Sequence, residues 1–203
     1  MKRYSRVVAA LCIVFSAGQA LPSQAQEAAV LYEEVKGGAP PDKTTGRVTW
    51  RTEQVQPAKG QFPETAIRAD IEIPSRVFKM SAVIQLNRDP SMPASHLTEV
   101  RFTLPPNFSG GSIQNAPGLL VGSGKGSRPV TIRGLAVKVE EGFFLIGFSN
   151  PTTDRQHNIR LLKEGKTIEI PFVYAGGLRA DVVIEKGPSG QAVIDQALKA
   201  WGQ

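Results

Sequence analysis

Hydrophobic and polar side chains alternate along much of this chain, a pattern typical of β-strands that bury one face. In the segment 67–73, isoleucine and alanine alternate with Arg68, Asp70 and Glu72. The same period of two continues in the segments 78–86, 99–104, 168–174 and 178–184. The last two are separated by Ala175-Gly176-Gly177, which suits a tight hairpin turn. These segments predict antiparallel strands.

The segment 142–149 is apolar at both odd and even positions, which predicts a central strand covered on both faces. Leu135, Val137 and Val139 indicate its partner strand, with a turn at 140–142. Weaker alternation at 29–35 and 46–55 predicts two further strands. About eight to ten strands of this kind favour a two-layer antiparallel β-sandwich over a parallel sheet.

Two segments have the period of a helix instead. The first, 152–164, follows Asn150-Pro151, carries a capping sequence at 153–156 and ends at Gly165. The second begins after Pro188 with Ser189 as its cap. Its apolar stripe comprises Val193, Ile194, Ala197, Leu198 and Trp201. We expect this C-terminal helix to pack on the sandwich rather than to bind a partner. The predicted fold class is therefore all-β, with one short helix and one C-terminal helix.

The first 25 residues contain the successive regions of a signal peptide, namely a basic start, an apolar run and a cleavage site with small residues. Lys2, Arg3 and Arg6 precede an apolar run at 7–17, which is too short to be an ordinary membrane anchor. Small residues predict cleavage after Ala25, with Ala20 as the second choice. We therefore expect residues 1–25 to be removed and 26–203 to form a single β-sandwich domain. Such a protein would be periplasmic or secreted and would not span the membrane after cleavage.

The charge balance disfavours a nucleic-acid partner. The 203-residue chain has 24 Lys and Arg against 18 Asp and Glu, but three of the cations lie in the predicted signal peptide. The remaining cations alternate with anions, as in 68–72, and form no basic stripe. Cys12 is the only cysteine and lies in the apolar run after Leu11, which argues against lipid attachment. We therefore expect no disulfide and no thiolate site after cleavage.

Familiar catalytic and cofactor motifs fail on inspection. The glycine-rich segment 122–127 has Leu119 where a phosphate loop needs glycine and Gly126 after the lysine, so we expect a flexible loop and no nucleotide. His96 and His157 are too far apart in sequence for a common metal motif, and no G-x-S-x-G elbow occurs. His96 is an even number of residues from Val100, so in an extended strand both side chains point to the same face. This pattern favours a buried imidazole over a catalytic base. No catalytic residue, metal or cofactor is predicted.

The C-terminal region resembles a known family. The segment 161–170, with sequence LLKEGKTIEI, is followed by the Gly176-Gly177 hairpin, a final strand and an alanine-rich helix. This succession resembles the C-terminal part of the invasion-associated locus B family of exported bacterial proteins. The whole chain is also similar to exported proteins of alphaproteobacteria. The resemblance implies a periplasmic or secreted, non-enzymatic β-sandwich linked to the cell envelope or to host interaction.

We expect an exported binding or accessory protein of the bacterial cell envelope, with another envelope or host protein as its partner. The binding surface is predicted on the long glycine- and proline-rich loop 105–129. Its apolar centre would be Phe108, Ile113 and Leu119, and its cationic rim Lys125 and Arg128. In the alternative interpretation, 119–121 is a short strand packed into the core.

Two other functions remain open at this stage. A periplasmic hydrolase would use His96 with a loop carboxylate and a hydroxyl in a cleft. A glycan-binding module would need two or more aromatic side chains on one exposed face.

We expect protein isolated from its native host to begin at Gln26, because the basic, apolar and small-residue regions follow in the required order. N-terminal sequencing of that protein measures the cleavage point. Intact Met1 on a cytoplasmic species would contradict the export prediction.

Overall fold

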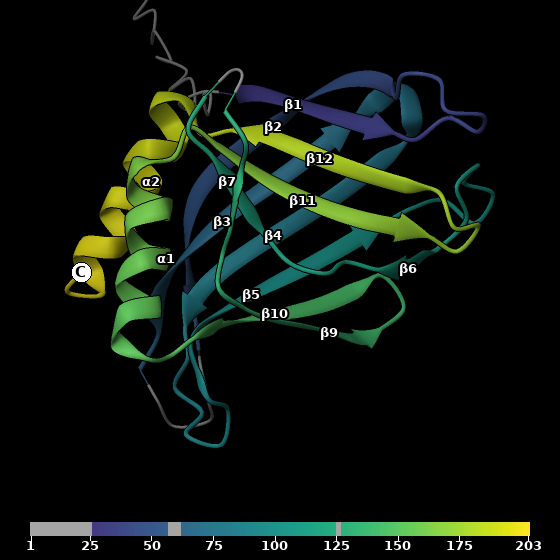
Figure 1. The fold of residues 1–203 in the computed structure, drawn as a ribbon. Coiled ribbons are helices and arrows are strands. Elements are labelled where there is room, and N and C mark those ends of the chain that lie inside the picture. The colour runs from purple at the N-terminus through teal and green to yellow at the C-terminus, as the bar shows by residue number, and fades with distance from the viewer. Residues whose placement is uncertain (1–25, 57–61, 125–126) are drawn as a thin grey trace, which may run out of the picture.

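The computed structural model describes residues 26–56, 62–124 and 127–203; the predicted signal peptide and Lys125 lie outside these ranges. The described strands form one curled, antiparallel sheet, with two helices side by side along one side of it (Figure 1). The all-β prediction is confirmed. The two packed sheets are not confirmed, because the strands belong to a single 12-stranded sheet.

Most predicted elements are present, with bounds that differ by a few residues. Along the chain they are β1 (Gln26–Glu33), β2 (Asp42–Val55), β3 (Glu64–Ile73), the 3-10 turn η1 (Pro74–Arg76), β4 (Phe78–Leu86), β5 (Ala94–Thr103), β6 (Ile113–Asn115), β7 (Leu120–Gly122), β8 (Val130–Thr131), β9 (Gly134–Glu140), β10 (Phe143–Ser149), α1 (Thr152–Glu164), β11 (Thr167–Tyr174), β12 (Arg179–Glu185) and α2 (Gly187–Ala200). The order across the sheet is β8-β7-β11-β12-β1-β2-β3-β4-β5-β10-β9, and β6 also pairs with β11.

An aromatic cluster fills the concave side of the curled sheet. The ring centroids of Phe102 in β5 and Phe172 in β11 lie 5.0 Å apart, and those of Phe78 in β4 and Phe172 lie 5.9 Å apart. Phe144 in β10 contacts Phe102 edge-on at 5.9 Å. Since β11 is not a neighbour of β4 or β5 in the sheet, these contacts exist only because the sheet curls. We call this concave side the inner face and the opposite side the outer face.

The segment 105–122 runs along the gap between the two ends of the sheet. The prediction of one continuous loop is wrong here, since β6 and β7 both pair with β11. The alternative, a short strand next to Leu119, is the arrangement observed. On the other side of the gap, Lys138 Nζ in β9 donates a hydrogen bond of 2.9 Å to the carbonyl oxygen of Ile113 in β6.

Both predicted helices form, but neither has the predicted N-cap. Helix α1 follows Pro151 without a side-chain cap. Helix α2 begins at Gly187, and Ser189 Oγ donates instead to Glu27 Oε1 at 2.7 Å. At the end of α1, buried Lys186 donates from Nζ to the carbonyl oxygen of Leu162 at 2.6 Å. A cation at this end is favourable because helix carbonyls carry partial negative charge.

Helix α2 packs on β2 and β3, as predicted for its apolar stripe, and Gly190 lies directly against Trp50 of β2. A Cβ at Gly190 would lie 2.8 Å from Nε1 of Trp50, whose indole donates to the Glu185 carbonyl oxygen at 3.0 Å. Glycine is therefore required here by space, although alanine is the better helix former.

We expect Gly190→Ala to lower the free energy of unfolding by about 1–3 kcal/mol, because overpacking outweighs the gain in helix propensity. Urea unfolding measures the change. Gln196→Ala, on the exposed face of the same helix, serves as control and should change stability by less than about 0.5 kcal/mol. A more stable Gly190→Ala protein would contradict this packing.

Candidate functional site

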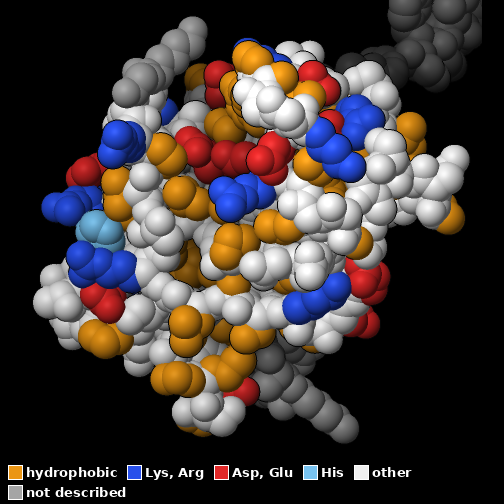
Figure 2. Space-filling model, turned by 45° about the vertical axis from the view of Figure 1, so that its right-hand side comes forward, with side chains coloured by type: hydrophobic (Ala, Val, Ile, Leu, Met, Phe, Trp, Pro, Cys, Tyr) orange, Lys and Arg blue, Asp and Glu red, His pale blue; other side chains and the backbone are white. Residues whose placement is uncertain are grey.

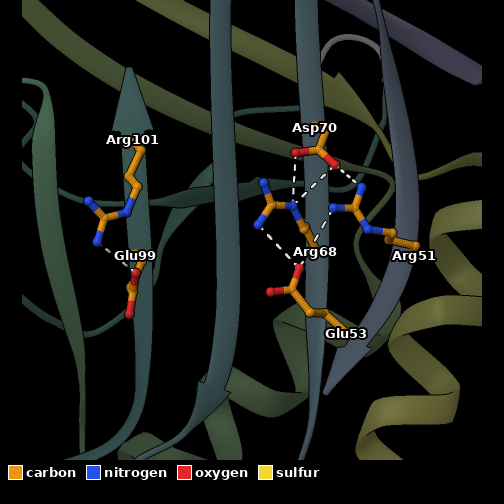
Figure 3. A network of polar contacts seen from close by, with 6 residues as sticks. All are labelled: Arg51, Glu53, Arg68, Asp70, Glu99 and Arg101. Atoms are coloured by element: carbon orange, nitrogen blue, oxygen red, sulfur yellow. Dashed lines mark hydrogen bonds and ion pairs between the residues drawn. The ribbon is translucent and has the colours of Figure 1, made fainter. Parts of the chain in front are cut away.

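The outer face of β2 and β3 carries a network of ion pairs. Arg68 Nε lies 2.9 Å from Asp70 Oδ1, and Arg68 Nη1 lies 3.1 Å from Glu53 Oε2. Arg51 also pairs with Asp70 and Glu53 (Figure 3). Two arginines and two carboxylates thus neutralise each other. This part of the outer face is polar, but it has no surplus charge to attract a ligand.

The outer face turns apolar beyond β5. The strand registers place residues of β5, β10 and β9 opposite one another in three rows. These rows are Leu97-Gly147-Leu135, Glu99-Leu145-Val137 and Arg101-Phe143-Glu140. Aliphatic residues dominate the first two rows, and in the third the Arg101 guanidinium lies 3.5 Å from the Phe143 ring centroid. We call this surface the β9–β10 face.

The β9–β10 face is hollowed at one end. Gly147 has no side chain, so a depression of about 440 Å³ opens between Leu97 and Leu135. Leu145 and Val137 line it on the side of the middle row, and Arg133 and Asp154 lie at its polar margin. Hydrophobic side chains gather in the lower part of the surface in Figure 2, the region in which β9 and β10 lie in Figure 1.

The side chains of β9 are unusually exposed for their type. Leu135 is 81% exposed, Val137 55% and Val139 53%. The neighbouring strand β10 also has partly exposed side chains on its outer face, so the sequence-based prediction that it is covered on both faces is wrong. Its inner residues, such as Phe144, are buried in the aromatic cluster, but its outer residues remain partly exposed because both helices lie elsewhere on the sheet. Exposed apolar side chains that lie together, rather than singly, often mark interaction sites.

Helix α1 holds the beginning of β9 in place. The side-chain amide of buried Asn158 accepts from the Arg133 backbone N–H at 2.9 Å and donates to the Arg133 carbonyl at 2.8 Å. The Arg133 guanidinium pairs with Asp154 at 2.7 Å, and Ser149 Oγ donates to the other carboxylate oxygen at 2.7 Å. Hydrogen bonds to Ser149 and Arg133 lower the pKa of Asp154. The polar margin of the depression is thus fixed by a closed set of contacts.

The backbone edge of β9 is poorly suited to bind another strand. Lys138 points to the inner face, where its ammonium lies 5.8 Å from the Phe144 ring centroid. The register also shifts between Phe143 and Phe144, which leaves Val139 as an extra residue in β9. Inward-pointing charges and bulges are two ways in which proteins prevent edge-to-edge pairing. The side-chain surface, rather than the strand edge, is therefore the available part of β9.

The residues predicted from the 105–129 loop do not come together at the surface. Phe108, Ile113 and Leu119 are 8%, 1% and 0% exposed and belong to the core. Arg128 is exposed, and Lys125 lies outside the described residues. Three core side chains do not form the exposed apolar centre that was expected, because β6 and β7 pack this segment against β11. A binding role for the rest of the segment stays a prediction.

His96 lies at the beginning of β5 and is 1% exposed, as its parity predicted. Its Nδ1 atom lies 3.1 Å from Ser95 Oγ, and its ring centroid lies 5.1 Å from that of Trp201. Burial and the nearby positive charge of Arg155 lower the pKa of His96 to about 4. Asp89, the carboxylate of the adjoining loop, is bonded to Ser91 Oγ at 2.6 Å. Asp89, Ser95 and His96 line one cavity of about 560 Å³, but among the described contacts the Asp89 carboxylate is bonded to Ser91 and the His96 ring to Ser95, so the two are not joined as a catalytic pair would be.

A second polar cluster lies at the opposite end of the inner face. Tyr174 Oη and Arg76 Nη2 both donate to Glu33 Oε1 at 2.7 Å, and burial raises the pKa of the Tyr174 hydroxyl. Val77, which follows Arg76, has a left-handed φ of 50°. Since Glu33 already pairs with Arg76, the cluster closes the core rather than offering a free charge.

Other classes of site find little support within residues 26–56, 62–124 and 127–203. This part of the chain holds no group of three His, Cys, Asp or Glu side chains arranged to bind a metal ion. None of its helices is both long and apolar enough to cross a membrane. No protein-family model, curated protein or solved structure matches the chain. The fold and the β9–β10 face therefore define the candidate site by themselves.

We expect His96 to make the protein less stable in acid. The unfolded chain takes up a proton near the ordinary pKa of 6.5, whereas the folded chain does so only near pH 4. This residue should therefore lower the free energy of unfolding by up to about 3 kcal/mol as the pH falls from 7 to 4. Urea unfolding across this range should show that the free energy of unfolding falls less with decreasing pH for His96→Gln than for the unmodified protein.

Asp181 affects the pH dependence of stability in the opposite sense to His96, so a variant of Asp181 provides a control for the sign of the effect. Burial and the neighbouring charge of Glu169 raise its pKa to about 7, so its contribution to stability is lost as the pH rises from about 4 to 7. In the Asp181→Asn variant, the free energy of unfolding should therefore fall more steeply as the pH is lowered from 7 to 4. Identical pH profiles for His96→Gln and the unmodified protein would contradict the assignment to His96.

Proposed function

We propose that this chain is an exported, non-enzymatic binding protein of the bacterial cell envelope, and that the β9–β10 face binds its protein partner. The observation that carries the proposal is the exposure of three aliphatic side chains along β9, Leu135, Val137 and Val139, beside a depression of about 440 Å³. Partner sites commonly combine an apolar centre with a polar rim. Here Arg133, Asp154 and Glu140 supply that rim.

The cellular location rests on the sequence. The signal-peptide pattern of residues 1–25 supports export, and the resemblance to the invasion-associated locus B family supports a role at the envelope or toward a host. The near balance of charges outside the signal peptide disfavours a nucleic-acid partner.

The two rival functions have weaker support. For the hydrolase, His96 contacts the Ser95 hydroxyl, while Asp89 in the adjoining loop is engaged by Ser91. For the glycan-binding module, Phe62 is the only aromatic among the strongly exposed large hydrophobic side chains of the described residues. The others are aliphatic, and aliphatic surfaces suit protein partners better than sugar rings.

Val137→Lys tests the face directly. A lysine in the middle row puts a charge into the centre of the surface, where desolvation is costly, so capture of a partner from an envelope extract should fall about tenfold or more. Quantitative mass spectrometry of the captured proteins measures the loss. Since Val137 is already exposed, the melting temperature should change little.

Val130→Lys is the matched control. Val130 is also an exposed strand valine, at 44%, but it lies in β8, which pairs with β7 and not with β9 or β10. The same set of proteins should be captured by this variant as by the unmodified chain. Equal capture by Val137→Lys and Val130→Lys would show that the β9–β10 face is not the binding site.

A further inference from the structure

Besides the β9–β10 face, the protein has a cavity of about 560 Å³ around His96, which we call the His96 cavity. Three parts of the chain that lie far apart in sequence form its wall: the loop 87–93 between β4 and β5, Asn150 and Arg155 at the beginning of α1, and Trp201 and Gln203 after α2. The segment 92–94 also lines the depression of the β9–β10 face, so it separates the two hollows.

The loop 87–93 is held in one shape by hydrogen bonds of its own. The side-chain amide of Asn87 donates to the carbonyl oxygens of Asp89, Met92 and Ala94 at 3.1, 3.0 and 2.8 Å. This side of the cavity is therefore formed before any ligand binds. A preformed site loses less conformational entropy on binding than a flexible one.

Most of the charge that lines the His96 cavity is already paired. Arg88 Nη2 lies 2.7 Å from Glu64 Oε1, and Asp89 Oδ1 accepts hydrogen bonds from the backbone N–H and the hydroxyl of Ser91. The exception is Arg155. Within the described part of the chain no carboxylate, including the terminal one, forms an ion pair with its guanidinium. Arg155 therefore leaves an unpaired positive charge in the wall.

A neighbouring hollow of about 550 Å³ adds to this positive charge. It shares Arg155 with the His96 cavity and continues along α1 past Arg160 and Lys163. Neither of these two cations has an ion-pair partner among the described residues, and Glu164 is the acidic side chain that lines this hollow there. Cations gathered along a hollow raise the local concentration of anions. The electrostatic field around Arg155 therefore favours an anion.

His96 lines the cavity with an incompletely bonded ring. Its side chain is buried and its Nδ1 atom lies 3.1 Å from Ser95 Oγ, but Nε2 has no hydrogen-bond partner among the described residues. Gln203 is near enough to favour the charged ring, although no hydrogen bond of normal geometry joins the two. Buried polar atoms without a partner are rare in folded proteins. The wall thus has an unsatisfied polar atom as well as an unpaired cation.

From the unpaired Arg155, the fixed loop and the incompletely bonded His96, we infer that the His96 cavity binds a small molecule that carries a carboxylate or phosphate group. Arg155 pairs with this group, since a guanidinium offers two parallel N–H donors to an oxyanion. The half-buried Trp201 ring provides an apolar surface for the rest of the ligand. This site lies outside the proposed protein-binding face and does not depend on it.

NMR titration of the purified protein with inorganic phosphate and with citrate, at an ionic strength held constant with sodium chloride, tests the site. We expect saturable binding of at least one of these anions. Arg155→Gln should raise its dissociation constant about tenfold or more, because charge-assisted hydrogen bonds are lost. Arg160→Gln is the matched control, since Arg160 is an exposed arginine of the same helix outside the His96 cavity. It should change the constant by less than about threefold.

The outcomes separate the two ligand classes. Tighter binding of phosphate assigns a phosphate ligand, and tighter binding of citrate assigns a carboxylate. Val137→Lys should bind the anion as the unmodified protein does, whether or not it loses a protein partner. Absence of binding by both anions would overturn the inference, and so would an equal effect of Arg155→Gln and Arg160→Gln. Thermal melting of each variant checks that the fold is retained.

The imidazole signals of the two histidines show where the anion lies. An anion on Arg155 cancels the positive charge that lowers the pKa of His96, so this pKa should rise by about 0.5 or more when the site is occupied. Arg155→Gln should raise the pKa in the same direction without any anion, and added anion should then have no further effect. The pKa of His157 is lowered by burial, Arg133 and Arg160, and should stay constant. A rise at His157 without one at His96 would place the anion elsewhere on α1 and overturn the inference.

Discussion

The contact between Phe102 and Phe172, with ring centroids 5.0 Å apart, is the constraint on which this structure depends. It joins β5 and β11, two strands far apart in the order of the sheet, and so requires the sheet to curl. Curling gives the sheet a single buried face, filled by aromatic side chains. The segment 105–122 then has to bridge the gap between the ends of the sheet, which explains why Phe108 and Leu119 are buried. The outer face receives no such cover over β9 and β10.

The sequence predicted individual strands well because the alternation of side chains is a local property. Ile67 to Ile73 and Ile168 to Tyr174 alternate as one-sided strands do, and both lie within strands of the structure. The number of sheets is not local. Whether twelve strands form two sheets or one depends on β1, which pairs with both β2 and β12 and makes the sheet continuous. No residue of β1 carries that information on its own.

The candidate site was missed for a related reason. The apolar residues of 142–149 correctly predict a strand, but their two-sided pattern also predicts cover on both sides, which the structure does not show. In the structure β10 is next to the last strand of the sheet, and its outer side is only partly covered. A strand that is apolar on both faces, beside the apolar alternation of Leu135 and Val137, therefore does not by itself indicate cover on both sides, because its outer side chains stay partly exposed near the edge of the sheet. Conversely, β6 and β7 have three residues each, too few to show a period of two.

The pairing of β1 with β12 has a consequence for the time course of folding. Ala29 lies opposite Ile184, so β1, which pairs with β2 on one side, finds its partner on the other side only in β12, near the end of the chain. Sheets with such distant pairings fold slowly, because a long loop must close before the contact forms. During synthesis β1 therefore stays unpaired on one side until nearly the whole chain is available. A chain that remains open for this time exposes an unpaired strand edge and needs protection from aggregation until β12 is available.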